Sequence, residues 1–462
     1  MQIVILGAGR VGESVAESLV SEQNDITMID PDPDRLRDLE DRLDLRGVPG
    51  NGIQPSVLRR AGLSDADLFI ACASLDETNL TACRVAKSVF GVQTTIARVR
   101  SEEFDEDSPL LGKDGFGVDH VICPEESVMH YVHKLIEYPE ALQVLEFSQQ
   151  RAHLIAARAA AGSLLVHHTI AEFKLLFPQA PMRVVAVYRQ DEELEINSHT
   201  RVIPGDEVFV LADRDKIKEI LSAIHKEDRP VRRIMIAGGG KVGLRLARSL
   251  AGNYQVKLIE RDRKRCDYLA GELGSDTLVL CGDSADEALL IEENVGEMDL
   301  FVSLTSDDED NILSAMLAKR LGVQRVIALV NRRIYADMMQ GSAIDIALSP
   351  AQTVIGELLV HVRRGAVAAV HSLRRGAAEA IEGVARGDAR SSKLVGQRIK
   401  DIALPEGARF GAIVRGHGDA CQVLMPHHDL LIETEDHVII FIPNKHQLRA
   451  VERLFQVSAT FF

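Results

Sequence analysis

Short apolar runs alternate with segments of helical periodicity through the first 124 residues of the chain. The runs lack the period-two alternation of a half-exposed strand, so we expect burial on both faces, as in a parallel sheet. The alternation predicts a doubly wound α/β domain with a Rossmann-like sheet. The predicted strands are Ile3–Leu6, Ile26–Ile29, Leu68–Ala73 and Thr95–Val99.

The pattern changes beyond this region, after a predicted helix at Glu126–Ile136. Shorter strands are now mixed with single helices, which predicts a small α+β domain. Its predicted elements are strands Leu142–Phe147, Met182–Tyr188 and Glu207–Leu211, a helix or loop at Thr169–Leu176, and a closing helix at Lys216–Ile224.

The second half of the chain repeats this plan. The segment Asp67–Ile70 matches Asp299–Val302 at an offset of 232 residues, and Asp76 and Asn79 match Asp308 and Asn311. The predicted elements of the last quarter are strand Ala366–Leu373, a helix at Leu394–Ile402, strands Gly411–Val414 and His437–Phe441, and helix Gln447–Phe455. A repeat of this length indicates duplication of a whole module.

The predicted order is therefore two α/β domains, each followed by a small α+β domain. We expect the α/β domains at 1–124 and 232–350, and the α+β domains at 140–225 and 366–455. The segment Glu227–Pro230 is the predicted linker, and its shortness favours halves that pack together.

A glycine fingerprint follows the first strand of each half. In GxGxxG, the first glycine permits a tight turn, the second lets backbone approach a pyrophosphate, and the third lets helix and strand pack closely. The helix then presents unpaired N–H groups to the phosphate. Both motifs therefore predict nucleotide binding, with Arg10 and Lys241 adding a cation. The motifs are Gly7, Ala8, Gly9, Arg10, Val11 and Gly12, and Gly238, Gly239, Gly240, Lys241, Val242 and Gly243.

An acidic residue ends the second predicted strand of each half. Asp30 and Glu260 lie 18 and 17 residues beyond the last glycine, which suits a carboxylate that accepts hydrogen bonds from an adenosine ribose. Such a carboxylate favours NAD over NADP, but it does not separate NAD(H) from ATP or ADP. Basic residues that follow Glu260 are interpreted as a solvated helix start.

Further candidate residues lie where this fold opens its crevice. Asn51 and Asp283 are placed either to bond an adenine edge or to cap the next helix, and the sequence leaves both open. Arg98 ends a strand and is placed to reach a phosphate, whereas its counterpart is Leu329, so we expect unequal sites. The remaining candidates are Ala73, Ser74, Thr305 and Ser306, at the ends of the fourth strands.

Charge and composition restrict the partners. The formal net charge of −16 disfavours nucleic acid and anionic lipid. No apolar run approaches the ~20 residues of a membrane helix, and no signal peptide is evident, so we expect a cytoplasmic protein without direct membrane insertion. Scattered cysteines in apolar runs predict buried, reduced thiols without a metal site. They are Cys72, Cys83, Cys123, Cys266, Cys281 and Cys421.

The chain shows no recognisable catalytic apparatus. Its 15 histidines are dispersed, and no Ser-His-Asp or Cys-His arrangement is suggested. Two nucleotide sites without such groups favour a sensor over an enzyme. The alternatives are an NAD-dependent oxidoreductase on the same fold and a scaffold that holds nucleotide permanently.

Both halves resemble the regulator-of-potassium-conductance (RCK/KTN) domain family, and the resemblance covers essentially the whole chain. It implies a peripheral regulator on the cytosolic face of the inner membrane. It also implies a homo-oligomer, a dimer or tetramer, that binds NAD(H) or adenine nucleotides and gates a membrane potassium-translocating subunit. The resemblance assigns the first site to Gly7 to Val11, Asp30, Ala73, Ser74 and Arg98, and the second to Gly238 to Val242 and Glu260.

Overall fold

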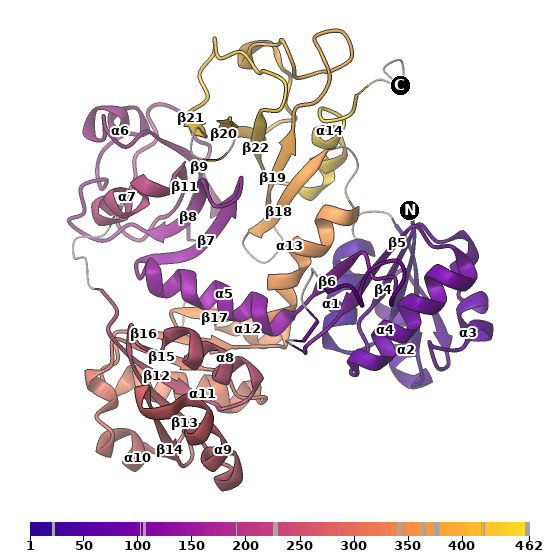
Figure 1. Cartoon of the computed structure of the whole chain (residues 1–462). Coiled ribbons are helices and arrows are strands. Elements are labelled where there is room, and N and C mark those ends of the chain that lie inside the picture. The colour runs from indigo at the N-terminus through magenta and orange to yellow at the C-terminus, as the bar shows by residue number, and fades with distance from the viewer. Residues whose placement is uncertain are drawn as a thin grey trace.

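The described part of the chain forms four β-sheets (Figure 1). Two are six-stranded and parallel and two are five-stranded, which confirms the predicted fold class of two Rossmann-like domains with two smaller α+β domains. The computed structural model describes residues 1–20, 24–101, 103–104, 108–190, 192–224, 230–339, 343–362, 366–373, 378–416, 418 and 421–457. Residues 227–229 of the predicted linker lie outside this range.

The first parallel sheet has the order β3-β2-β1-β4-β5-β6, so the chain reverses direction across the sheet between β1 and β4. Such a switch point opens a crevice at the carboxyl ends of the strands. The strands are β1 (Gln2–Leu6), β2 (Asp25–Asp30), β3 (Arg46–Pro49), β4 (Leu68–Ala71), β5 (Thr94–Arg98) and β6 (His120–Ile122). The helices are α1 (Arg10–Val20), α2 (Pro33–Arg42), α3 (Pro55–Arg60) and α4 (Asp76–Val85).

The second parallel sheet repeats this order as β14-β13-β12-β15-β16-β17. Its strands are β12 (Arg233–Ala237), β13 (Gln255–Glu260), β14 (Thr277–Cys281), β15 (Leu300–Ser303), β16 (Arg325–Leu329) and β17 (Ile346–Leu348). Its helices are α8 (Lys241–Leu250), α9 (Arg263–Leu273), α10 (Glu287–Glu292), α11 (Asp308–Arg320) and α12 (Arg333–Met338).

The two antiparallel sheets also share one topology, in the orders β10-β9-β11-β8-β7 and β21-β20-β22-β19-β18. The first contains β7 (Ala141–Phe147), β8 (Ala152–Arg158), β9 (Met182–Arg189), β10 (Glu192–Glu193) and β11 (Glu207–Asp213), with α6 (Ile170–Leu176) and α7 (Ile217–Ile224). The second contains β18 (Val367–Leu373), β19 (Ala378–Val384), β20 (Arg409–Arg415), β21 (Gln422–Leu424) and β22 (His437–Ile442), with α14 (Leu448–Glu452).

The predicted helix at Leu394–Ile402 is wrong. Only a short 3₁₀ turn, Ile399–Asp401, forms there. Gly396 has a φ of +78°, which a helix does not accommodate, and its N–H bonds the carbonyl of Ile432 at 2.9 Å. Long-range backbone bonds of this kind satisfy the segment without a helix.

Two long helices connect each parallel sheet to the antiparallel sheet that follows it: α5 (Pro124–Glu137) and α13 (Pro350–Val362). Each packs against the parallel sheet of the other half (Figure 1). Val128 and Val132 of α5 are buried in the core of the second sheet, and Leu358 of α13 in that of the first. The halves therefore exchange helices and share two cores.

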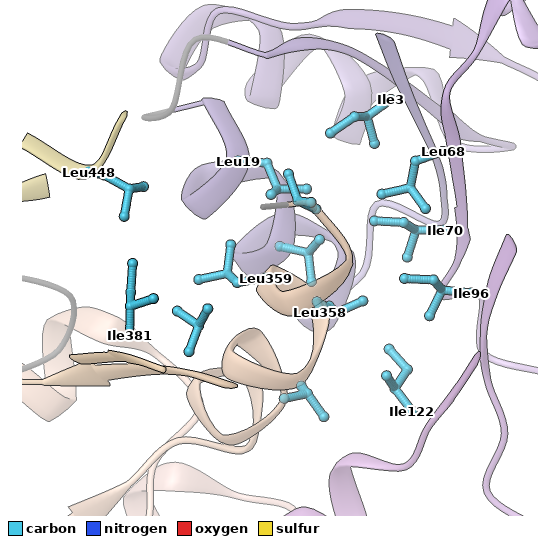
Figure 2. Close-up of a cluster of buried hydrophobic side chains, with 14 of the residues drawn as sticks. Ile3, Leu19, Leu68, Ile70, Ile96, Ile122, Leu358, Leu359, Ile381 and Leu448 are labelled. Carbon is cyan, nitrogen blue, oxygen red and sulfur yellow. The ribbon is translucent and has the colours of Figure 1, made fainter. Parts of the chain in front are cut away.

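Figure 2 shows the core that α13 completes. Leu359 lies between Leu19 of α1 and Ile381 of β19, while Leu358 faces Ile96 of β5, and all of these side chains are buried. Burying a leucine side chain is worth about 1.5–3 kcal/mol. This cluster therefore ties the first parallel sheet to the last antiparallel sheet.

The two antiparallel sheets pack on one another, and hydrogen bonds to one buried carboxylate join them. Glu382 of β19 is 2% exposed and accepts hydrogen bonds from the N–H and Oγ of Ser148, each at 2.9 Å. It also pairs with His437 of β22. Burial opposes ionisation of Glu382, but the bonds from His437 and Ser148 outweigh it and lower its pKa. The hydrogen bond that His437 donates to Glu382 in turn raises the pKa of His437.

Among the described residues, no helix is long and apolar enough to cross a bilayer.

We predict that Glu382→Gln destabilises the protein in a pH-dependent way. The raised pKa of His437 stabilises the fold below its ordinary value of about 6.5, and this contribution disappears as pH rises through the raised pKa. The substitution should therefore cost about 1.5–3 kcal/mol near pH 6 and less near pH 8.5. Urea unfolding at both pH values checks it, with His437→Gln as the matched variant. An equal loss at both would contradict the charge-pair interpretation.

Candidate nucleotide-binding sites

The first glycine of each fingerprint makes the turn from strand to helix. Gly7 and Gly238 have φ values of +104° and +105°, which disfavour residues with a side chain. A Cβ on either would lie 2.9 Å from backbone atoms just beyond β4 or β15. Both positions therefore require glycine.

The last glycine lets the helix pack on this turn. A Cβ on Gly12 would lie 1.9 Å from the carbonyl oxygen of Gly7, and one on Gly243 equally close to that of Gly238. These contacts fix the first turns of α1 and α8 beside the loops. The geometry matches the role that the sequence predicts for the third glycine.

The middle glycine is different. A Cβ on Gly9 or Gly240 would meet nothing within 4 Å. Neither is required by the protein's own packing, so the absence of a side chain leaves room for a ligand to approach the backbone. Arg10 and Lys241 follow directly, with exposed side chains at the helix starts.

The two acids hold the loops in the same way. One oxygen of Asp30 accepts the N–H of Ala8 at 2.7 Å, and one oxygen of Glu260 accepts that of Gly239 at 2.9 Å. The second oxygen accepts the N–H two residues beyond each acid, at 2.9 Å in both cases. A carboxylate oxygen has a further acceptor position, so both acids remain able to bind a ribose hydroxyl.

The second loop carries an additional cation. Arg265 Nε donates to the carbonyl of Gly239 at 2.8 Å, and its guanidinium lies 4.7 Å from the centre of the Tyr268 ring. The equivalent Arg35 in the first half pairs with Asp32 at 3.3 Å. The two sites therefore carry an arginine at the same position, but only in the second does it bond the glycine loop.

Asn51 and Asp283 occupy equivalent exposed turns. Their side chains accept the N–H of Ile53 at 3.1 Å and of Ala285 at 2.9 Å. The helix-cap alternative is wrong, because the N-cap residues of α3 and α10 are Gln54 and Asp286. A role for Asn51 and Asp283 toward adenine stays a prediction.

Ala73, Ser74, Thr305 and Ser306 lie just beyond β4 and β15, where the crevice opens. A buried asparagine in each half shapes this edge. Asn79 accepts the N–H of Ala73 at 2.8 Å and donates to the carbonyl of Arg98 at 2.8 Å. Asn311 bonds Thr305 and Leu329 in the same way. These amides clamp two neighbouring strand ends together.

A buried or half-buried aspartate reinforces each clamp. Asp76 accepts the N–H groups of Arg100 and Ser101, and Asp308 accepts those of Asn331 and Arg332, at 2.8–3.0 Å. The sequence repeat had matched Asp76 with Asp308 and Asn79 with Asn311 without assigning a role. The occurrence of the same polar residues at matching positions of both halves was the sequence feature from which these clamps could have been predicted.

Arg98 is engaged within the protein. Its Nη2 donates to Glu125 at the start of α5, at 3.1 Å, and both side chains are largely buried. The second half has Leu329 and Ala351 at these positions, so both charges are absent together. Whether Arg98 also meets a phosphate stays a prediction.

A large cavity lies away from both candidate sites. It measures about 1000 Å³ and is bounded by α5, α13, β7 and residues 344–349, without any fingerprint residue. Glu146 lies in its wall, with its carboxylate 2.9 Å from His130 Nε2 and 2.7 Å from Lys134 Nζ. Burial opposes its ionisation, but these bonds dominate and lower its pKa to about 2. Glu146 therefore stays ionised and ties α5 to β7.

Comparisons with known proteins agree with this architecture. The TrkA-N domain model matches residues 3–124 and 234–350, and the TrkA-C domain model matches residues 154–225 and 389–456. The chain is 47% identical to the Trk system potassium uptake proteins TrkA of Vibrio alginolyticus and of Halomonas elongata, over the full length of all three. A solved GsuK channel bound to NAD shares the fold at 17% identity, with a TM-score of 0.59 over 98% of this chain and 78% of that one.

These matches cover both halves of the chain and all four sheets. The chain belongs to the family of Trk system potassium uptake proteins TrkA.

Proposed function

We propose that this protein is the cytosolic regulatory subunit of a Trk-type potassium uptake system. It binds NAD(H) or an adenine nucleotide at two sites and gates a membrane potassium-translocating subunit. The main support for this proposal is the glycine loop that occurs in both halves. In each loop, the protein's own packing does not require the middle glycine, and the nearby acid, Asp30 or Glu260, can accept a further hydrogen bond.

The first site comprises Gly7 to Gly12, Asp30, Asn51, Ala73, Ser74 and Arg98, and the second Gly238 to Gly243, Glu260, Asp283, Thr305 and Ser306. Phosphates would bind at the N-termini of α1 and α8, where backbone N–H groups lack helical partners. The ribose would bond the acid of each site. NAD is the first ligand to test, since the GsuK channel that shares this fold binds it.

Gating requires that the ligand bind two conformations unequally. The exchanged helices could transmit such a change between the halves, because α1 packs in one core with α13 and α8 packs in one core with α5. We propose a homo-oligomer, a dimer or tetramer, held peripherally on the cytosolic face of the inner membrane by its membrane partner. Symmetric assembly is the usual arrangement of such subunits.

The alternative is an NAD-dependent oxidoreductase. A hydride transfer needs a positioned substrate and an acid or base beside the cofactor. Near the loops, the described carboxylates and amides are engaged in holding backbone. Substrate-dependent oxidation of NADH by the purified protein would establish the alternative and overturn the regulatory proposal.

Gly9→Ala is expected to leave the fold unchanged and to weaken nucleotide binding about 10–100-fold, because the new Cβ meets only the ligand's space. Gly240→Ala should do the same at the second site. Thermal unfolding and calorimetric titration separate the two effects. If the Gly9→Ala protein has normal thermal unfolding and binds nucleotide like the wild type, the pyrophosphate does not bind at this loop.

Asp30→Asn and Glu260→Gln test the ribose contact. Each keeps an oxygen for the loop N–H but removes the charge, and a hydrogen bond to a charged group contributes about 1.5–3 kcal/mol, or roughly 10–150-fold in affinity. Titration of NAD⁺, NADH, ATP and ADP against both variants shows which nucleotide binds and whether the two sites bind it with the same affinity. Wild-type affinity for all four ligands in both variants would contradict the assignment.

We further expect Gly9→Ala to abolish nucleotide-dependent regulation of potassium flux while binding to the membrane subunit persists. The experiment reconstitutes the membrane subunit in vesicles with wild-type or variant protein and measures ⁸⁶Rb⁺ uptake with and without nucleotide. Co-sedimentation with the vesicles controls for assembly. If nucleotide changes ⁸⁶Rb⁺ uptake equally with the variant and with the wild type, nucleotide binding at the first site does not regulate the potassium flux.

A further inference from the structure

Two cysteines meet at the second candidate site. Cys281 ends β14 and is the strand partner of Glu260, and Cys266 lies in the first turns of α9. The thiol of Cys266 donates to the carbonyl of Glu260 at 3.2 Å. Helix α9 packs on strand β14, and Cys281 lies close enough to Cys266 to raise the pKa of its thiol. Both sulfurs therefore flank the residue proposed to hold the ribose.

The two thiols differ in access. Cys281 is exposed, whereas Cys266 is 6% exposed. The expectation that the cysteines are buried is thus wrong for Cys281. Burial, and after it the neighbouring Cys281 thiol, raise the pKa of Cys266 to about 12. Of this pair, Cys281 is the thiol that a dissolved oxidant reaches first.

The first site carries no such pair. The N-cap residues Asp32 and Asp262 align α2 with α9, and this places Leu36 at the position of Cys266. The strand partner of Asp30 is Pro49, where the second site has Cys281. An oxidant that reacts with this pair of thiols would therefore modify the second candidate site and leave the first unmodified.

We propose that Cys266 and Cys281 form a redox-active dithiol that peroxide oxidises to a reversible disulfide. Hydrogen peroxide oxidises the Cys281 thiolate to a sulfenic acid, and hydroxide leaves and is protonated to water. The Cys266 sulfur then attacks the Cys281 sulfur, the S–O bond breaks, and the proton of Cys266 leaves with the hydroxide as a second water. Overall, two thiols and one peroxide give one disulfide and two waters.

The disulfide acts on the second nucleotide site. Cys281 directly precedes Gly282 and Asp283, and Gly282 donates its N–H to the carbonyl of Glu260 at 2.9 Å. Bonding Cys281 to Cys266 tethers the start of α9 to this turn and removes the thiol's bond to Glu260. We expect oxidation to weaken nucleotide binding there by about tenfold, within the usual range of coupling between sites. This consequence rests on the proposed function, whereas the disulfide does not.

The disulfide is tested on the full chain. Reduced protein is treated with hydrogen peroxide, alkylated and digested, and its peptides are identified by mass spectrometry. We expect a Cys266–Cys281 linked pair that dithiothreitol reverses. Cys266→Ser should instead trap a dimedone-reactive sulfenic acid on Cys281, and the matched Cys421→Ser should leave the cross-link unchanged. Oxidation of Cys281 without a cross-link to Cys266, or no reaction at Cys281, would overturn the proposal.

The consequence is tested by calorimetry in the Asp30→Asn background, in which binding reports mainly the second site. Oxidation should weaken binding in this protein and leave Asp30→Asn/Cys281→Ser unchanged. A disulfide that forms without altering affinity would overturn the regulatory consequence. Failure of the reduced wild type to bind nucleotide at all would overturn the proposed function, while the mass spectrum would still decide the disulfide.

Discussion

The exchange of α5 and α13 between the halves is the constraint on which the rest of the structure depends. One face of each parallel sheet is completed by an apolar helix from the other half, and each buried side chain contributes about 1.5–3 kcal/mol. Neither half can bury this face alone. Arg325 at the start of β16 reinforces the arrangement by donating to the carbonyls of Leu135, Pro139 and Ala141 at the end of α5. The duplicated modules thus fold as one unit.

This arrangement also brings the two candidate sites into contact. Arg245 lies on α8, the helix that begins at the second glycine loop, and donates to the carbonyl of Arg100 at 2.9 Å and to Cys123 Sγ at 3.0 Å. Arg100 in turn is held by Asp76 at the crevice of the first site. Helix α8 is therefore bonded directly to residues at the rim of the other candidate site. Coupling between sites requires such shared elements with differential contacts.

Local features of this fold could be predicted from the sequence, and long-range ones could not. The glycine loops and the acids that follow them could be predicted from spacing, since each motif and its acid lie within about 30 residues. The apolar faces of α5 and α13, by contrast, do not indicate which of the two parallel sheets each helix covers. The exchange of these helices between the halves was therefore not predictable. Strand β19 was not predicted, and it carries Glu379 and Glu382, which are buried although glutamate is almost never fully buried unless paired. The wrong helix at 394–402 fails for a related reason, because its backbone bonds residues some 30 positions away.

The two candidate sites differ where a pair of charges in one half corresponds to a pair of uncharged residues in the other. The ion pair of Arg98 with Glu125 is replaced by Leu329 and Ala351, so neither charge is left buried alone, which would cost several kcal/mol. The loop clamps, in contrast, are kept in both copies, because removing a buried amide would leave backbone groups unsatisfied. Structural polar contacts are therefore shared, and rim charge and thiol chemistry vary. A second copy that keeps its loop geometry while changing its rim can answer a different signal through the same helices.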